Sequence, residues 1–286
     1  MPKQSLIRKP EIAKSLVWSS RFEIFFSHFL IVCALTLWPA LASALSEDEA
    51  RSMLDGDAPK GELTLSQHKG ISLIGLPAPT GATFDVPIMK PDQALKAISE
   101  ALSLIETSSP FSKSQIERLK KAGPVTIVYD PRYPDKLSNM ASVQVALFSP
   151  HYYNKSRGKK TKNTFLVIVS RHGVKWPLKE LAAVMVHELV GHGIQHLNNR
   201  WGEMRLIDME CEAWLYEEMA YQNMKIDKFS NAMVDFKKQL EKQCDSFLRY
   251  LRGNDPKGSQ LWESLNPDVP RLLTHFSGYQ KHLKNR

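Results

Sequence analysis

The sequence has 286 residues, 43% of them hydrophobic and 24% charged, a globular composition that excludes a disordered or fibrous chain. The net charge is +8, but residues 1–44 hold five basic and two acidic side chains, which leaves +5 for the rest of the chain. A charge this mild and this dispersed argues against a nucleic-acid-binding protein.

The first 44 residues have the pattern of an export signal. Basic residues extend to Arg21, an apolar run follows from Phe22 to Trp38, and Ala42-Ser43-Ala44 fits a small-x-small cleavage site. The run is shorter than the roughly 20 apolar residues that cross a bilayer. We therefore expect a signal peptide that is cleaved after Ala44, rather than a retained membrane anchor. The mature protein is then periplasmic or secreted, with no membrane attachment.

Two cysteines remain in the predicted mature chain, Cys211 and Cys244. Export to an oxidising compartment would permit a disulfide between them. Two separate buried thiols fit the sequence equally well, because the spacing of two cysteines along the chain does not give their distance in space.

Short elements are expected at the start of the mature chain. Residues 45–60 suggest a short polar helix, and residues 61–90, rich in Gly, Pro and Thr, suggest loops and short strands. Apolar residues then recur at helical spacing over Pro91–Glu106, with proline in the first turn. A second, amphipathic helix is predicted for Ser112–Ala122, ended by Gly123-Pro124.

A strand-rich block follows. Runs of β-branched and apolar residues predict three strands, at Val125–Tyr129, Ser142–Phe148 and Thr164–Ser170. The polar and basic segment between the last two strands is expected to be a solvated hairpin-type loop.

The remainder is predicted to be helical. Helices are expected over Leu178–Leu197, about Glu203–Met224 and about Lys228–Leu251, followed by a short helix and a basic tail. Helices, then strands, then helices indicate an α+β fold. We expect one domain of residues 45–286, with a strand-containing part at about 61–175 and a helical part at about 176–286.

The chemistry is concentrated in Val184–Asn198, within the first of these helices. The zinc-peptidase motif H-E-x-x-H places two histidines four residues apart on one helix face, with the glutamate beside the metal. Here His187-Glu188 is followed by His192, five residues after the first histidine. On a regular helix the two histidines would point roughly 140° apart. A π-bulge near Val190–Gly191 would bring them to one ion.

A second arrangement needs no bulge. Glu188, His192 and His196 lie at i, i+4 and i+8, so they form one stripe of a regular helix and could hold a metal themselves. A hydrolytic site, however, needs a glutamate that is free to act as general base. We therefore predict the bulged helix, with His187 and His192 as ligands.

The sequence H-E-L-V-G-H resembles the H-E-x-x-G-H motif of the dipeptidyl-peptidase III family, a group of gluzincins with the same extra residue. That family takes its third zinc ligand from a following E-E-C-R-A-(E/D) segment, which Met209–Trp214 resembles. The resemblance implies a zincin-like domain in which Glu210 is the third ligand. Met209 and Trp214 depart from the pattern, and the likeness covers only these two motifs. The carboxylate that orients a ligand histidine is then expected from Asp208, Glu212 or Glu217.

These residues predict an exported zinc metallopeptidase that hydrolyses a peptide or protein substrate. Glu188 is the expected general base, and Zn²⁺ is the expected cofactor. His196, Glu212 and Tyr216 are expected either to support the ligands or to contact substrate. The candidates for polarising the carbonyl oxygen in the transition state are Tyr216, Tyr221, Tyr153 and His275.

Two further expectations bear on this function. The strand Thr164–Ser170, if it edges the cleft, can pair with an extended substrate. The competing functions are a non-catalytic periplasmic zinc-binding module that uses Glu188, His192 and His196, and a binding domain without metal.

Overall fold

The computed structural model describes residues 45–134, 144–153 and 163–285. The predicted export signal lies outside these residues, as does most of the predicted loop between the second and third strands. No helix within the described ranges combines the length and the hydropathy needed to cross a membrane.

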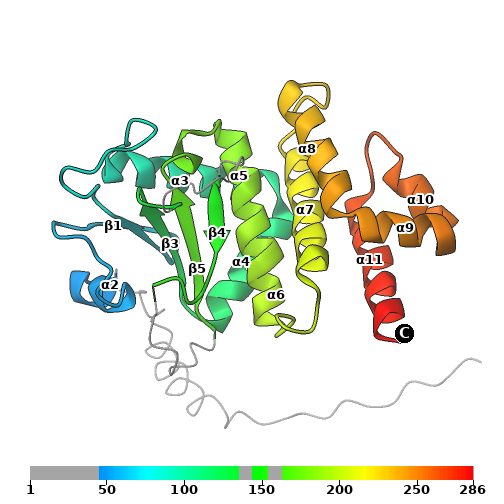
Figure 1. Ribbon diagram of the computed structural model, residues 1–286, viewed down its shortest axis with the longest axis horizontal. Coiled ribbons are helices and arrows are strands. Elements are labelled where there is room, and N and C mark those ends of the chain that lie inside the picture. Colours follow the sequence, from blue (N-terminus) through cyan, green and yellow to red (C-terminus); the bar gives the residue numbers. More distant parts are fainter. Residues whose placement is uncertain (1–44, 135–143, 154–162, 286) are drawn as a thin grey trace, which may run out of the picture. The chain divides into compact units, whose positions relative to one another are not determined.

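Five strands form one mixed sheet in the order β1-β2-β3-β5-β4 (Figure 1). β1 (Thr64–His68) pairs antiparallel with β2 (Ile71–Gly75), and β2, β3 (Val125–Asp130) and β5 (Phe165–Ser170) run parallel. β4 (Ala146–Phe148) pairs antiparallel with β5 at the sheet edge. The predicted strand Thr164–Ser170 is therefore internal, between β3 and β4, and does not edge a cleft; the edge position belongs to β4.

β3 and β5 are buried on both faces, which explains their continuous apolar runs. Ile127 and Val167 belong to the larger core, which includes α3 (Pro91–Ser108) and α4 (Pro110–Ala122). Their neighbours Val128 and Ile168 point to the opposite face. There they meet a smaller core that includes Ala50 of the short helix α2 (Glu47–Met53).

A long helix runs beside the sheet (Figure 1). It consists of α5 (Leu178–Val186), the π-helical segment η2 (His187–His192) and α6 (Gly193–Leu197). A short 3-10 turn, η1 (Gly173–Lys175), precedes it. The limits of the long helix agree with the predicted helix. The next helix, α7 (Leu206–Asn223), packs against η2 and α5. It begins later than predicted because Asn199 and Gly202 have positive φ angles of 54° and 88° and turn the chain between α6 and α7.

The C-terminal helices differ from the prediction in two ways. The single helix expected over Lys228–Leu251 is two helices, α8 (Asn231–Gln243) and α9 (Asp245–Asn254), which meet at Cys244. The residues after Pro256 form α10 (Pro256–Trp262) and a long helix, α11 (Val269–Lys284), that takes in most of the predicted basic tail. Burial of one face of α11 at Leu272, Phe276 and Tyr279 explains why the tail is helical.

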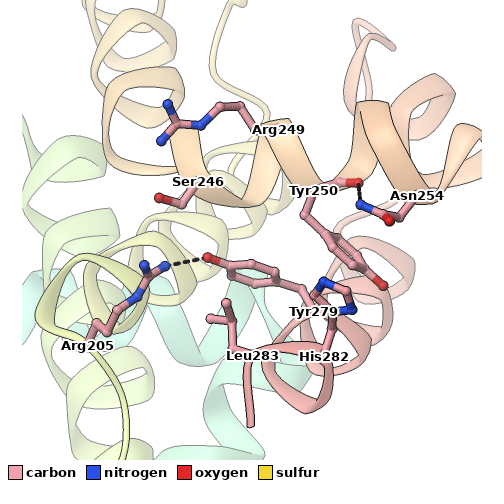
Figure 2. Close-up of a pocket in the computed structure, with 8 residues that line it drawn as sticks. All are labelled: Arg205, Ser246, Arg249, Tyr250, Asn254, Tyr279, His282 and Leu283. Carbon is pink, nitrogen blue, oxygen red and sulfur yellow. Dashed lines mark hydrogen bonds between the residues drawn. The ribbon is translucent and has the colours of Figure 1, made fainter. Parts of the chain in front are cut away.

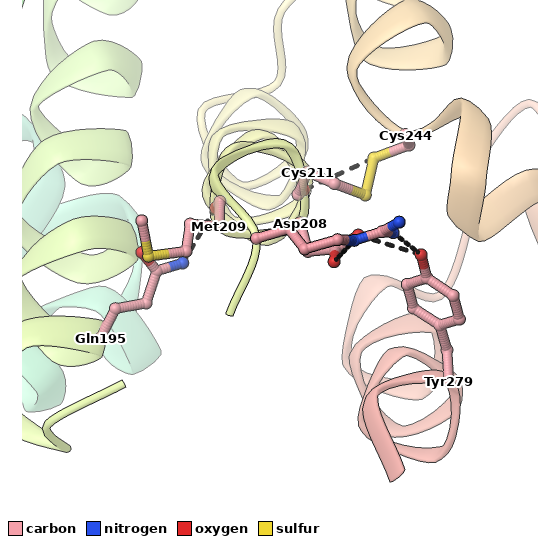
Figure 3. The surroundings of a disulfide bond; sticks show 7 residues. Gln195, Asp208, Met209, Cys211, Cys244 and Tyr279 are labelled. Carbon is pink, nitrogen blue, oxygen red and sulfur yellow. Dashed lines mark hydrogen bonds and ion pairs between the residues drawn. A yellow bond between two sulfur atoms is a disulfide. The ribbon is translucent and has the colours of Figure 1, made fainter. Parts of the chain in front are cut away.

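Cys211 and Cys244 form a disulfide, which decides between the two states that the sequence left open. The bond joins α7 to the junction of α8 and α9 (Figure 3). On the other side of α7, Gln195 of α6 donates to the carbonyl of Met209. The first turns of α7 are thus tied to elements on both sides.

Candidate metal centre

The bulge predicted in the long helix is present. In η2 the Gly193 N–H donates to the carbonyl of Glu188, five residues back, rather than four as in an α-helix. The wider turn takes up the extra residue between the histidines, and the ring centroids of His187 and His192 lie 4.9 Å apart. The expected distortion of the helix is therefore confirmed.

Gly191 allows η2 to lie close to α7. A Cβ atom at Gly191 would lie 2.6 Å from the Cβ of Ala213, closer than two carbon atoms approach. Glu210 precedes Ala213 by three residues and so lies on the same face of α7. The contact between glycine and alanine consequently brings the Glu210 carboxylate to the two histidines.

His187, His192 and Glu210 converge on one point. The Nε2 atom of His187 lies 3.5 Å from one oxygen of Glu210, and the Nε2 atom of His192 lies 3.5 Å from the other. One donor atom from each residue falls within 4.8 Å of the others. Two imidazole nitrogens and a carboxylate oxygen are a donor set that suits zinc and leaves its fourth position open. The residues therefore fit a metal ion.

The other nitrogen of each imidazole ring is also engaged. His187 Nδ1 lies 3.0 Å from the Glu217 carboxylate, and His192 Nδ1 lies 3.0 Å from the side-chain oxygen of Gln195. If each Nδ1 carries the proton and donates it, the Nε2 lone pairs face Glu210. This is how ligand histidines are held in metal sites. Of the three carboxylates expected to orient a histidine, only Glu217 contacts one.

The other two carboxylates have different partners. Asp208 accepts hydrogen bonds from Arg205 and from the Tyr279 hydroxyl; Figure 3 shows the contact with Tyr279. Glu212 accepts one from Gln195 at 2.9 Å and one from Arg200 at 2.7 Å. Glu212 thus supports His192 indirectly, through Gln195. The sequence did not single out Gln195, because a glutamine three residues after a histidine has no metal-site signature.

His187 and Glu210 shift each other's pKa. Burial alone would lower the pKa of His187, but its hydrogen bonds to Glu210 and Glu217 and the nearby charge of Glu188 raise it to about 10. Burial would raise the pKa of Glu210, but the hydrogen bond to His187 and the charge of His192 lower it below its ordinary value. Without a metal, His187 is therefore a cation between two carboxylates.

Glu188 is held by the edge strand. The Phe148 N–H, at the end of β4, donates to the Glu188 carboxylate at 2.6 Å, and the Glu188 side chain is buried. A pocket of about 310 Å³ joins Glu188 to the three converging residues. The wall is completed by residues of β4 and the segment before it, the loop after β3, the turn between α6 and α7 and the start of α7: Tyr133, Gln144, Ala146, Leu147, Phe148, Trp201, Leu206 and Met209.

The alternative ligand set does not come together. Among the described residues, the histidine and carboxylate groups close enough to share an ion do not include Glu188 or His196. The His196 ring packs between the rings of Phe148, Phe165 and Trp201, with centroids 5.6 to 5.8 Å away. Burial, followed by the charge of His151, lowers the pKa of His196.

None of the four residues expected to polarise the carbonyl oxygen lines this pocket. Tyr153 donates to Asp130, Tyr216 stacks on Phe111, Tyr221 packs on Phe236 and His275 pairs with Asp255. Tyr133, which the sequence analysis did not single out, does line the pocket; burial and the charge of Glu188 raise its pKa.

The loop that carries Tyr133 is held by Arg171. The buried Arg171 guanidinium donates to the carbonyls of Tyr133 and Pro134 at 3.0 Å and also bonds Asp85. Nothing in the sequence near Tyr133 indicates a site, because the link to Arg171 and Glu188 exists only in the folded chain.

A second pocket, of about 270 Å³, lies between α9 and α11 (Figure 2). Arg205 lines it and bonds both Asp208 and the Tyr279 hydroxyl, so its charge is already balanced. None of the predicted site residues lines this pocket.

No family model matches the chain, and searches of the curated proteins and of the solved structures find no match. The case for a function therefore depends on the geometry of the site.

Proposed function

We propose that the protein is an exported, zinc-dependent metallopeptidase with the gluzincin arrangement of ligands in a zincin-like domain. The proposal depends on one observation, the convergence of His187, His192 and Glu210. The Nδ1 atom of each imidazole is hydrogen-bonded as well, to Glu217 and to Gln195 respectively. The disulfide supports export, because such bonds persist in oxidising compartments.

The converging residues, their hydrogen-bond partners and Glu188 each have a role in this proposal. His187, His192 and Glu210 hold the metal, while Glu217 and Gln195 fix the orientation of the imidazole rings. Bound zinc supplies a Lewis acid that lowers the pKa of a water molecule to about 7. Glu188 takes a proton from the attacking water and delivers it to the amine that leaves. The Phe148 N–H keeps the Glu188 carboxylate in place for both transfers.

The substrate is proposed to be a peptide in extended conformation. β4 has a pairing partner on one side only within the described sheet, and Ala146 and Leu147 of this strand line the pocket. An extended peptide can add to such an edge through main-chain hydrogen bonds. Pairing there would place a peptide bond beside Glu188, which accepts its hydrogen bond from the end of the same strand.

We further propose that the Tyr133 hydroxyl donates to the oxyanion that develops on the substrate carbonyl. Tyr133→Phe should then lower kcat by about 100- to 1,000-fold, the usual effect of removing one such donor. The metal content should not change, because Tyr133 does not belong to the converging group. Steady-state kinetics with a peptide substrate, together with zinc analysis, will check this. Unchanged kcat would show that the Tyr133 hydroxyl has no part in the reaction.

Zinc binding should become tighter as the pH rises from 7 to 9. Because the pKa of His187 is raised to about 10, the metal must displace the His187 proton throughout this range. We expect about one proton to be released per ion and the affinity to rise by about tenfold per pH unit. Calorimetry in buffers of different ionisation enthalpy measures both.

The variant Glu217→Gln tests the cause of this pH dependence. Loss of the Glu217 charge removes one cause of the raised pKa of His187, so the dependence above pH 7 should become shallower. Zinc affinity should also fall by about 10- to 100-fold, as for other orienting partners. An affinity of the unaltered protein that stays constant from pH 7 to 9 would contradict the predicted proton displacement.

A further inference from the structure

The pocket continues from the three converging residues onto an apolar rim. Trp201 and Leu206 line this rim, with side chains 39% and 68% exposed, although large apolar side chains are usually buried. Met209, one turn after Leu206 on α7, and Leu147 of β4 extend the same surface inward. Exposed apolar groups that gather beside a polar site mark a ligand contact more often than isolated ones do.

Trp201 is fixed in position rather than free on a loop. Its ring packs at 5.6 Å on both Phe148 and His196. The preceding residue, Arg200, donates its backbone N–H to the carbonyl of Gln195 and its guanidinium to Glu212. The residues that orient His192 therefore also hold the rim, so the rim and the converging residues share the same supporting contacts.

The distance from Glu210 to the rim matches the distance from a reacting peptide bond to a neighbouring substrate side chain. Leu206 precedes Glu210 by four residues on α7, which is about one helical turn, or roughly 5.4 Å. An extended peptide advances by about 3.3 Å per residue. A side chain within one or two residues of a peptide bond held at the three converging residues would then reach the rim.

We propose that Trp201 and Leu206 form a subsite for a bulky apolar side chain, aromatic or branched aliphatic, adjacent to the bond that is cleaved. This inference rests on the proposed peptidase function. It names the substrates as peptides with such a residue at the cleavage position, and it makes Trp201 and Leu206 the residues that determine specificity.

The test uses two peptides of equal length and charge that differ only in a central leucine or serine. Hydrolysis by the zinc-loaded protein is followed by mass spectrometry, and binding without hydrolysis is measured by calorimetry on the Glu188→Gln variant. Both kcat/KM and affinity should favour the leucine peptide by about tenfold or more, since even one methylene in an apolar pocket changes them by about 10- to 200-fold. Cleavage should occur next to the leucine.

Leu206→Ser and Trp201→Ala should each reduce this preference several-fold. Leu265→Ser is the matched control, because Leu265 is 71% exposed and lies outside the pocket. The control should keep the full preference. Leu206→Ser is not expected to unfold the protein, since the Leu206 side chain is largely in solvent.

The outcomes separate this inference from the proposed function. Equal cleavage of both peptides, or a preference that survives both rim substitutions, overturns the subsite and leaves the peptidase intact. Tighter binding of the leucine peptide that depends on Trp201 and Leu206, without hydrolysis by the unaltered protein, supports the subsite and counts against the peptidase. Absence of any binding overturns the subsite.

Discussion

Glu188→Gln is expected to keep its zinc and to lose peptide hydrolysis by about 100- to 10,000-fold, the range that general acid–base catalysis contributes. The amide has the shape of the carboxylate, and its oxygen can still accept the hydrogen bond from the Phe148 N–H. It cannot take a proton from water. Glu188 also lies outside the converging group, so the ligands remain complete.

The measurement pairs kcat for a peptide with zinc content on the same sample. Glu180→Gln is the matched control: the same change on the same long helix, at a half-buried position that does not line the pocket. That variant should keep both zinc and activity. Full activity of Glu188→Gln would overturn the peptidase assignment, while simultaneous loss of zinc would show that Glu188 serves the metal rather than the reaction.

Much of the fold follows from local patterns. The apolar runs of β3 and β5 and the helical periodicity of α3 and α5 are visible in the sequence, because burial on two faces or on one stripe dictates the residue types. The break at Cys244 is not visible. Apolar residues recur at helical spacing across it, and the disulfide to Cys211 is a tertiary contact that periodicity does not report.

The site residues likewise divide into those that the sequence predicts and those that it does not. The spacing of His187 and His192 predicts the π-helical segment, because no regular helix brings residues five apart to one side. Glu210 came from a resemblance between motifs and not from geometry. Tyr133 and Gln195 could not be found from sequence, since their relation to the site depends on contacts between separate elements.

Gly191 links the local distortion of the helix to its packing against α7. The predicted bulge falls at Gly191, and the structure adds a requirement from packing, since a side chain at Gly191 would collide with Ala213. The same contact presses α7 against η2 and so sets the distance from Glu210 to the histidines. Bulge and third ligand are consequently parts of one arrangement.

His187→Ala is expected to abolish stoichiometric zinc binding, whereas His196→Ala should retain it. His187 supplies one of three converging donors, so its loss should weaken zinc binding by more than the roughly 10- to 100-fold cost of removing an orienting partner. His196 contacts aromatic rings instead, so its loss should affect packing and not the metal. Elemental analysis and calorimetry on protein purified without chelators measure both.

This pair of variants also distinguishes between the two possible sets of metal ligands. A non-catalytic module built on Glu188, His192 and His196 requires the opposite pattern, with zinc kept in His187→Ala and lost in His196→Ala. Because either change could disturb folding, the thermal unfolding of each variant is compared with that of the unaltered protein in the presence of a chelator. A variant that unfolds normally without metal but no longer gains stability from added zinc has lost a ligand and not its fold. We expect this behaviour of His187→Ala alone.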